Sequence, residues 1–266
     1  MADNQVVVKT ENVVKKFGDR TILNGVNIEI NKGETFVIMG GSGCGKSTLL
    51  RHMIGALKPD SGKVWLLGKE LSSLNEPKMD EVRKKIGMCF QSAALFDSMT
   101  VGENVSLPLR EHTRLAENII SIMVKMKLEL VGLRGFEDLM PSQLSGGMRK
   151  RVGLARAISM DPEIIFYDEP TAGLDPIVGG VIDKLILDLS KKLSITSVVV
   201  THDMSSVFRI ADKIAMLYEG RVLQVGTKEE IKNSKNEMVR QFITGSPDGP
   251  ISFFQQKDDY LEQLTA

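Results

Sequence analysis

The sequence has few cysteines and no net charge, and each of these shortages argues against a class of protein. Only Cys44 and Cys89 occur in the 266 residues, which indicates a reducing compartment rather than a disulfide framework. The 34 basic residues are balanced by 34 acidic ones, so we expect no general attraction to nucleic acid or to an anionic membrane surface. The 42% hydrophobic and 26% charged fractions are those of an ordinary globular protein, which argues against intrinsic disorder.

Long apolar runs are also missing. The longest uncharged stretches, residues 35–45 and 86–96, contain 11 residues each. A helix that spans a bilayer needs about 20. The first residues, MADNQVVVKTE, lack the basic and apolar regions of a signal peptide. We therefore expect a folded cytoplasmic protein that does not itself cross a membrane.

Strand and helix patterns alternate along most of the chain, which predicts an α/β fold. Short apolar or β-branched runs predict strands at residues 6–14, 22–30, 35–39, 64–68, 86–90, 164–168 and 197–203, and a hairpin over 213–226 with its turn at Glu219-Gly220. Helical spacing follows the strand at 35–39 and returns at 148–158 and 177–193.

The domain boundaries follow from where this alternation stops. From residue 92 to 142 the pattern is helical, and with the helix at 148–158 it places a helical subdomain at about 92–160. Residues 5–244 then form one domain that contains this insertion. Residues 245–266 carry two prolines and little periodicity, so we expect a C-terminal tail.

A glycine-rich segment between a predicted strand and a predicted helix fits the phosphate-binding pattern G-x-x-x-x-G-K-[ST]. Glycines let backbone N–H groups close around phosphate oxygens, and the following helix adds its dipole. The lysine of this pattern reaches the β- and γ-phosphates, and the hydroxyl after it ligates Mg²⁺. The residues are Gly40, Gly41, Ser42, Gly43, Cys44, Gly45, Lys46 and Ser47.

Two acidic residues follow the apolar run at 164–167. A strand there would present Asp168 and Glu169 at its carboxyl end, where ligands bind in open α/β sheets. Two carboxylates at that place suit Mg²⁺ coordination and polarisation of a water molecule. Taken alone the pattern is common, and the phosphate-binding segment upstream makes it specific.

A third motif, residues 144–148 (LSGGM), precedes the helix at 148–158. Ser145 is a candidate N-cap, and Gly146 and Gly147 would leave N–H groups exposed to an anion. With the phosphate-binding loop and the acidic strand, this motif closely resembles the signature of ATP-binding cassette (ABC) ATPases over roughly residues 5–240. The resemblance implies an ABC ATPase domain with a P-loop, RecA-like mixed-sheet core, an N-terminal antiparallel β-subdomain and an inserted α-helical subdomain.

The resemblance also implies roles for individual residues in binding and hydrolysing ATP with Mg²⁺. Phe17 would stack on adenine, with a core phenylalanine as the alternative. Asp168 would ligate Mg²⁺ with Ser47 and Gln91. Glu169 would be the general base, assisted by Lys46, Gln91 and His202. The nucleotide would contact residues 40–47, Thr48, the signature residues Ser145, Gly146 and Gly147, and Asp175 in the loop that crosses a dimer interface.

Four further features carry weaker predictions. The signature usually ends in glutamine, and Met148 stands there, which leaves its contact with the opposing nucleotide open. Cys44 near Lys46 at a helix N-terminus favours a thiolate that ATP would protect from alkylation, with an inert small residue as the alternative. His52 and His112 have no partner motif and are expected to be structural. Residues 149–151 (RKR) predict a solvated basic helix face.

Shorter segments around residues 108–113, 131–135, 139–142 and 248–250 resemble one subfamily, the ATPases of bacterial Mla/MCE phospholipid transporters. That resemblance implies a homodimer peripheral to the cytoplasmic face of the bacterial inner membrane. Its partners would be an integral permease, an MCE-domain protein and a STAS-domain subunit, with phospholipid as substrate and no nucleic acid. The permease would dock on residues 92–142, and the tail would reach over the second ATPase subunit, with a disordered terminus as the alternative. The alternatives are a transporter ATPase for another solute, a non-transport ABC ATPase, and an ATP-binding regulatory module without turnover, against which the intact Lys46, Asp168, Glu169 and His202 argue.

Overall fold

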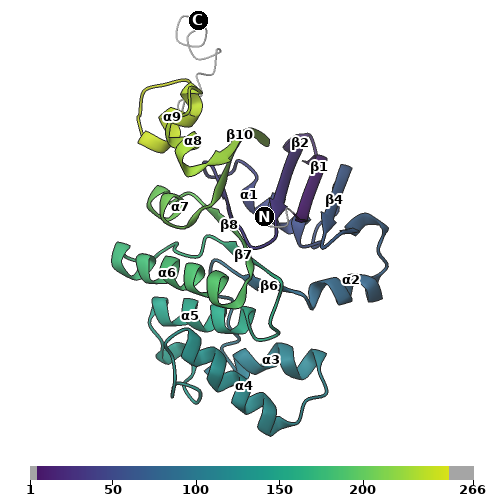
Figure 1. The fold of residues 1–266 in the computed structure, drawn as a ribbon, viewed down its shortest axis with the longest axis vertical. Coiled ribbons are helices and arrows are strands. Elements are labelled where there is room, and N and C mark those ends of the chain that lie inside the picture. The colour runs from purple at the N-terminus through teal and green to yellow at the C-terminus, as the bar shows by residue number, and fades with distance from the viewer. Residues whose placement is uncertain (1–4, 252–266) are drawn as a thin grey trace, which may run out of the picture.

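The computed structural model describes residues 5–251, and its strands form two sheets (Figure 1). A four-stranded antiparallel sheet has the order β2-β1-β4-β5, and a six-stranded mixed sheet has the order β10-β9-β3-β8-β7-β6. The expected α/β class, the N-terminal antiparallel sheet and the mixed core are all confirmed. The smaller sheet lies at the upper right of Figure 1, beside the carboxyl-terminal part of the core.

The antiparallel sheet is built on a long hairpin. The chain turns through Gly18 and Asp19, where Gly18 has φ 57, a conformation that glycine adopts without strain. Both strands are longer than the sequence predicts, so that Phe17 and Arg20 belong to strands and pair directly. The four strands are β1 (Val6–Phe17), β2 (Arg20–Asn31), β4 (Ser61–Leu66) and β5 (Lys69–Glu70).

In the mixed sheet, parallel pairing brings the carboxyl ends of five strands to one edge. β6, β7, β8, β3 and β9 run parallel, and β10 closes the sheet as the predicted antiparallel hairpin with β9. The chain leaves β3, β6, β7, β8 and β9 at the same edge, which is where open α/β sheets bind ligands. The strands are β3 (Thr35–Met39), β6 (Ile86–Cys89), β7 (Ile164–Asp168), β8 (Thr196–Thr201), β9 (Lys213–Tyr218) and β10 (Arg221–Thr227).

The central strand β3 is apolar throughout because both of its faces are covered. Phe36 and Ile38 pack into the core shared with the antiparallel sheet, whereas Val37 and Met39 pack into the core shared with the helices. All four side chains are fully buried. Burial of such a side chain contributes roughly 1.5–3 kcal/mol, so these two cores hold the strand and the loop that follows it in place.

Helices cover the mixed sheet, and three of them form the lower part of the molecule in Figure 1, where α3 and α4 lie beyond α5. The helices are α1 (Lys46–Met53), α2 (Glu76–Arg83), α3 (Val101–His112), α4 (Glu117–Leu130), α5 (Gly146–Ala157), α6 (Pro176–Leu193), α7 (Met204–Ile210), α8 (Lys228–Lys232) and α9 (Glu237–Thr244), with 3₁₀ turns η1 (Leu71–Ser73) and η2 (Pro141–Gln143). Within residues 5–251, no helix combines the length and apolar character needed to cross a membrane.

The sequence did not predict α2, α8 and α9, which are short and depend on local caps. Asn75, Thr227 and Asn236 each accept a hydrogen bond from a backbone N–H of the helix that follows. The boundaries proposed for the domain, 5–244, and for its helical subdomain, about 92–160, remain predictions. At the start of the expected tail, Gln241 holds Ile251 through Oε1 and Nε2 at 2.7 and 3.0 Å. The rest of that tail lies outside the described residues.

Candidate functional site

The loop between β3 and α1 needs glycine at two positions because neighbouring backbone leaves no room for a Cβ. A Cβ on Gly40 would lie 2.2 Å from the Leu217 carbonyl oxygen, and one on Gly45 would lie 2.9 Å from that of Ile22. Gly45 also has φ 106, which L side chains rarely adopt. The end of β9 and the start of β2 therefore press against the loop and determine its shape.

The loop closes around the Lys46 side chain. Its ammonium donates hydrogen bonds to the carbonyl oxygens of Gly40 and Gly41 at 2.8 and 2.9 Å, and the residue is 7% exposed. Helix α1 begins here with Gly45 as its N-cap and has no side-chain cap. Its first N–H groups therefore stay available to an anion bound in the loop.

Ser47 and Asp168 meet although 121 residues separate them in the sequence. The Ser47 hydroxyl donates to Oδ1 of Asp168 at 2.9 Å. Asp168 is the last residue of β7, and Ser47 lies in the first turn of α1. A hydroxyl and a carboxylate oxygen thus lie side by side at the sheet edge, and both are ligands that Mg²⁺ prefers.

Glu169 is held in a restricted conformation directly after β7. It has φ 48, and its backbone N–H donates to the Val200 carbonyl oxygen at 2.8 Å. Its carboxylate accepts a hydrogen bond from the Thr201 hydroxyl at Oε2, at 3.2 Å, and Oε1 lies 2.9 Å from Nδ1 of His202. A carboxylate can only accept, so Nδ1 must carry the hydrogen in this pairing.

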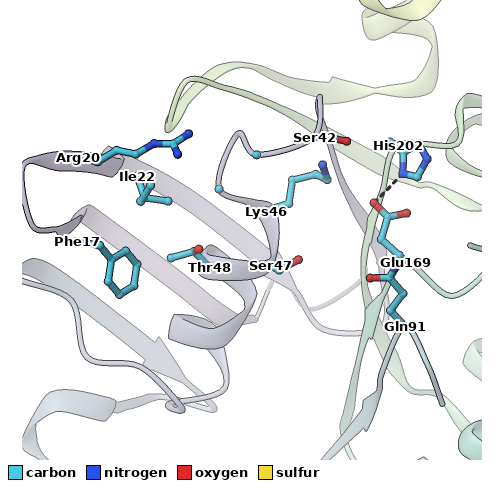
Figure 2. Close-up of a pocket in the computed structure, with 12 residues that line it drawn as sticks. Phe17, Arg20, Ile22, Ser42, Lys46, Ser47, Thr48, Gln91, Glu169 and His202 are labelled. Carbon is cyan, nitrogen blue, oxygen red and sulfur yellow. Dashed lines mark hydrogen bonds and ion pairs between the residues drawn. The ribbon is translucent and has the colours of Figure 1, made fainter. Parts of the chain in front are cut away.

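Lys46, Ser47, Glu169 and His202 line one cavity of about 440 Å³, and Asp168 lies just outside its lining, beside Ser47. Figure 2 shows Lys46, Ser47 and Thr48 facing Gln91, Glu169 and His202, with Phe17 and Ile22 beyond Thr48 on the side away from Glu169. Further lining comes from Arg20, Ser42, Gly43 and Gly45. The ends of β3, β6, β7 and β8 thereby supply a basic group, hydroxyls, a carboxylate and an imidazole around a space large enough for a polar ligand.

Phe17 lies at the mouth of this cavity, and its side chain is not part of the core. The residue is 54% exposed, and the Lys15 ammonium lies 5.4 Å from the centroid of its ring. The alternative of a core phenylalanine is therefore wrong. An exposed ring at the end of a strand offers a face on which a planar ligand can stack.

The signature residues lie outside this cavity. Ser145 caps α5 by accepting a hydrogen bond from the Met148 N–H at 3.3 Å, as predicted, and it is exposed together with Gly146. Asp175 is exposed as well and caps α6 through the N–H groups of Ile177 and Val178, both at 3.0 Å. Within one chain the structure brings neither group to the phosphate-binding loop.

Comparison with known proteins places this arrangement in a family. A family model described as ABC transporter matches residues 23–172. The chain belongs to the ABC transporter family. The intermembrane phospholipid transport system ATP-binding protein MlaF of Haemophilus influenzae is 45% identical over 261 residues, which are 98% of this chain and 99% of that protein. MlaF of Escherichia coli K12 is 43% identical over 93% of this chain and 92% of that protein.

Solved structures agree with the assignment. The dimeric structure of the ATP-binding cassette MJ0796, in a post-hydrolysis state bound to ADP and phosphate, superposes with a TM-score of 0.77. It is 35% identical and covers 83% of this chain and 98% of that one. The cavity described above therefore belongs to an ABC cassette.

Two predictions made from the sequence of this ABC cassette are wrong for the same reason, burial. Burial raises the pKa of the Cys44 thiol and outweighs the nearby Lys46 ammonium, so the protonated thiol is favoured over the expected thiolate. In the basic stretch 149–151, Lys150 is 7% exposed and its ammonium contacts the carbonyl oxygens of Gln91 and Glu169. The stretch is therefore not a uniformly solvated face.

The sequence reasoning missed Lys150, Thr201, Arg20 and Ile22 as residues of this ABC cassette site. Thr201 ends the strand before His202, a position that already suggested a ligand-facing edge. Lys150 follows Gly147 by three residues, so helical spacing places both on the buried face of α5. His52 is buried and His112 is exposed at the end of α3, and neither lines the cavity.

Proposed function

We propose that this chain is the ATP-binding and ATP-hydrolysing subunit of a phospholipid transporter of the Mla type. The observation that carries the hydrolytic part is the pairing of Glu169 with Thr201 and His202, which aims one carboxylate at the cavity that also contains Lys46 and Ser47. The substrate class is supported by the relatives, whose names describe intermembrane phospholipid transport.

ATP would lie along the cavity from its mouth to its base. The exposed ring of Phe17 suits adenine, and the N–H groups of residues 41–48 suit the phosphates. Lys46 would exchange its contacts with Gly40 and Gly41 for the β- and γ-phosphate oxygens, a better partner for an ammonium than neutral carbonyls. Binding energy is thereby used to place the γ-phosphate near Glu169.

The oxygen donors at the sheet edge fit Mg²⁺. Ser47 and Asp168 already lie within hydrogen-bond distance, and Gln91 lines the same cavity with a neutral amide oxygen. Hard oxygen ligands of this kind match the preference of Mg²⁺. When bound, the ion would supply charge neutralisation for the β- and γ-phosphates.

In hydrolysis, Glu169 would accept a proton from the attacking water. Thr201 and His202 hold both oxygens of the carboxylate, which fixes its direction before the substrate arrives. His202 would also contact the γ-phosphate with the other edge of its ring, since its side chain is 59% exposed and the residue lines the cavity. Catalysis would then consist of positioning and charge stabilisation.

A second copy of the chain would complete each site. Ser145, Gly146 and Asp175 are exposed and remote from the cavity of their own chain, so their N–H groups would meet the nucleotide bound by a partner copy. The dimeric state of the related cassette MJ0796 supports this arrangement. We further infer an integral permease, an MCE-domain protein and a STAS-domain subunit as partners, on the cytoplasmic face of a bacterial inner membrane.

Purification and turnover test the two parts of this proposal separately. The full chain is assayed for phosphate release from ATP with and without Mg²⁺, and we expect release that requires the ion. Separately, the chain is captured from detergent-solubilised membranes, and its partner proteins and lipids are identified. Recovery of a permease for another solute without an MCE protein would overturn the phospholipid assignment and leave the ATPase assignment standing.

A further inference from the structure

Lys150 connects the helix that follows the signature with the backbone of two site residues. It lies one turn into α5 and is 7% exposed. Its ammonium donates a hydrogen bond to the carbonyl oxygen of Gln91 and another, at 3.3 Å, to that of Glu169. One side chain thus spans the ends of β6 and β7, the two strands after which Gln91 and Glu169 occur.

The segment that follows Gln91 is attached to the same face of α5. Arg156 donates to the carbonyl oxygens of Ala93 and Ala94 at 2.7 and 2.8 Å. Between the two cations, Gly153 packs so closely that a Cβ there would lie 3.2 Å from that of Ala93. Lys150, Gly153 and Arg156 are three residues apart and share one helix face. Residues 91–94 are therefore attached to α5 at three successive places.

The backbone that these hydrogen bonds hold, at residues 93, 94 and 169, is strained. Ala93, Ala94 and Glu169 have φ values of 62, 47 and 48, a region that non-glycine residues rarely occupy. Such conformations persist only where the surroundings hold them. The side chains of Lys150 and Arg156 stabilise these conformations by donating hydrogen bonds to the carbonyl oxygens of the three residues. The backbone N–H of Glu169 also donates to the Val200 carbonyl oxygen.

Separating the buried Lys150 ammonium from its hydrogen-bond partners would also cost free energy. Within residues 5–251 its hydrogen-bond partners are carbonyl oxygens, and burial lowers the pKa of Lys150. Movement of α5 away from either carbonyl would leave a buried cation partly unpaired, which is costly. The helix and the two strand ends should therefore move together.

We propose that Lys150 is a positioning residue that transmits movement of α5 to Gln91 and Glu169 of its own chain. The N-terminus of α5 carries Ser145 and Gly146, which in the proposed dimer meet the nucleotide of the partner copy. Nucleotide in one site would then adjust the attacking machinery of the other, and the two sites would hydrolyse ATP cooperatively. This inference rests on the proposed function, since it requires the dimer and its turnover.

The test replaces Lys150 by an isosteric apolar residue in the full chain. In Lys150→Met we expect kcat to fall by about tenfold or more, because both carbonyls lose a charged donor. ATP affinity, measured by equilibrium binding, should stay within about twofold, since the phosphate-binding loop is untouched. The Hill coefficient for ATP should fall towards one, because coupling between two sites is lost. Lys150→Arg, which keeps the charge and the donors, should recover part of both losses.

Lys127 provides a matched control. It lies on α4, is also 7% exposed, and its ammonium pairs with the Asp161 carboxylate rather than with a site residue. Lys127→Met removes an equally buried lysine from the same group of helices. We expect its kcat and Hill coefficient to equal those of the wild type.

Three results would overturn the inference. A kcat for Lys150→Met within about twofold of wild type would exclude a positioning role. A parallel loss of ATP affinity and melting temperature would indicate a structural role only, and an unchanged Hill coefficient would exclude the coupling. If Lys150→Met does not fold, Lys150→Gln is judged by the same criteria. A wild-type chain without Mg²⁺-dependent turnover would instead remove the proposed function, and the inference with it.

Discussion

Nδ1 of His202 lies 2.9 Å from Oε1 of Glu169, across the ends of two adjacent parallel strands. Thr201 holds the other carboxylate oxygen at 3.2 Å. The direction of the Glu169 carboxylate is thus set by two residues of β8 and the loop that follows it, before any ligand binds.

Glu169→Gln keeps the shape of the side chain but removes its ability to accept a proton. We expect kcat to fall by about 10²- to 10⁴-fold, the usual contribution of a general base. ATP should still bind, so an ATP-bound dimer should accumulate and elute earlier in size-exclusion chromatography. Hydrolysis at the wild-type rate would remove Glu169 from the role of base.

His202→Ala removes one of the two groups that orient Glu169. We expect kcat to fall by about 10²-fold, since a misplaced base loses most of its contribution, while equilibrium ATP binding changes little. His112→Ala is the matched control, because His112 is exposed at the end of α3 and does not line the cavity. A His202 variant with full turnover would show that Thr201 alone suffices.

Phe17→Ala removes the exposed ring at the mouth of the cavity. Stacking contributes about 0.5–1.5 kcal/mol, so the KM for ATP should rise by roughly 2- to 13-fold with kcat nearly unchanged. Phe17→Tyr keeps the ring and should behave like the wild type. Equal KM values for the alanine and tyrosine variants would contradict the stacking role.

His52 makes the folded state sensitive to acid. It is 1% exposed, and burial lowers its pKa from 6.5 to about 4. The unfolded chain therefore binds a proton that the folded chain rejects, and stability falls as the pH drops from about 6.5 towards 4. Between pH 7.5 and 5 this one group should cost about 2 kcal/mol.

Urea unfolding at the two pH values checks the size of this effect. His52→Phe should lose most of the difference, whereas His112→Phe, which changes an exposed histidine, should retain it. Equal acid sensitivity in the wild type and His52→Phe would assign the effect to other groups.

Much of the fold was predictable because its strongest patterns are local. The runs at 35–39 and 164–168 form β3 and β7 with the predicted limits, because each is an almost continuous apolar run that is buried in the core. The helix α1 ends at Met53 because Gly55 takes φ 69 and the chain turns there. The helices α2, α8 and α9 were missed because their stability depends on single capping residues and packing.

The phosphate-binding loop, the acidic strand end and His202 could be identified from the sequence, because parallel strands bring their carboxyl ends to one edge whatever the loops between them do. Only the tertiary structure decided which side chains are buried or partly buried. Burial raises the pKa of Cys44, which disfavours the expected thiolate. Lys150 is 7% exposed, although the sequence predicted a solvated side chain. Phe17 stayed exposed because its strand ends beyond the core. The sequence by itself determined which chemical groups lie at this edge of the sheet, and packing decided which of those groups are accessible to a ligand.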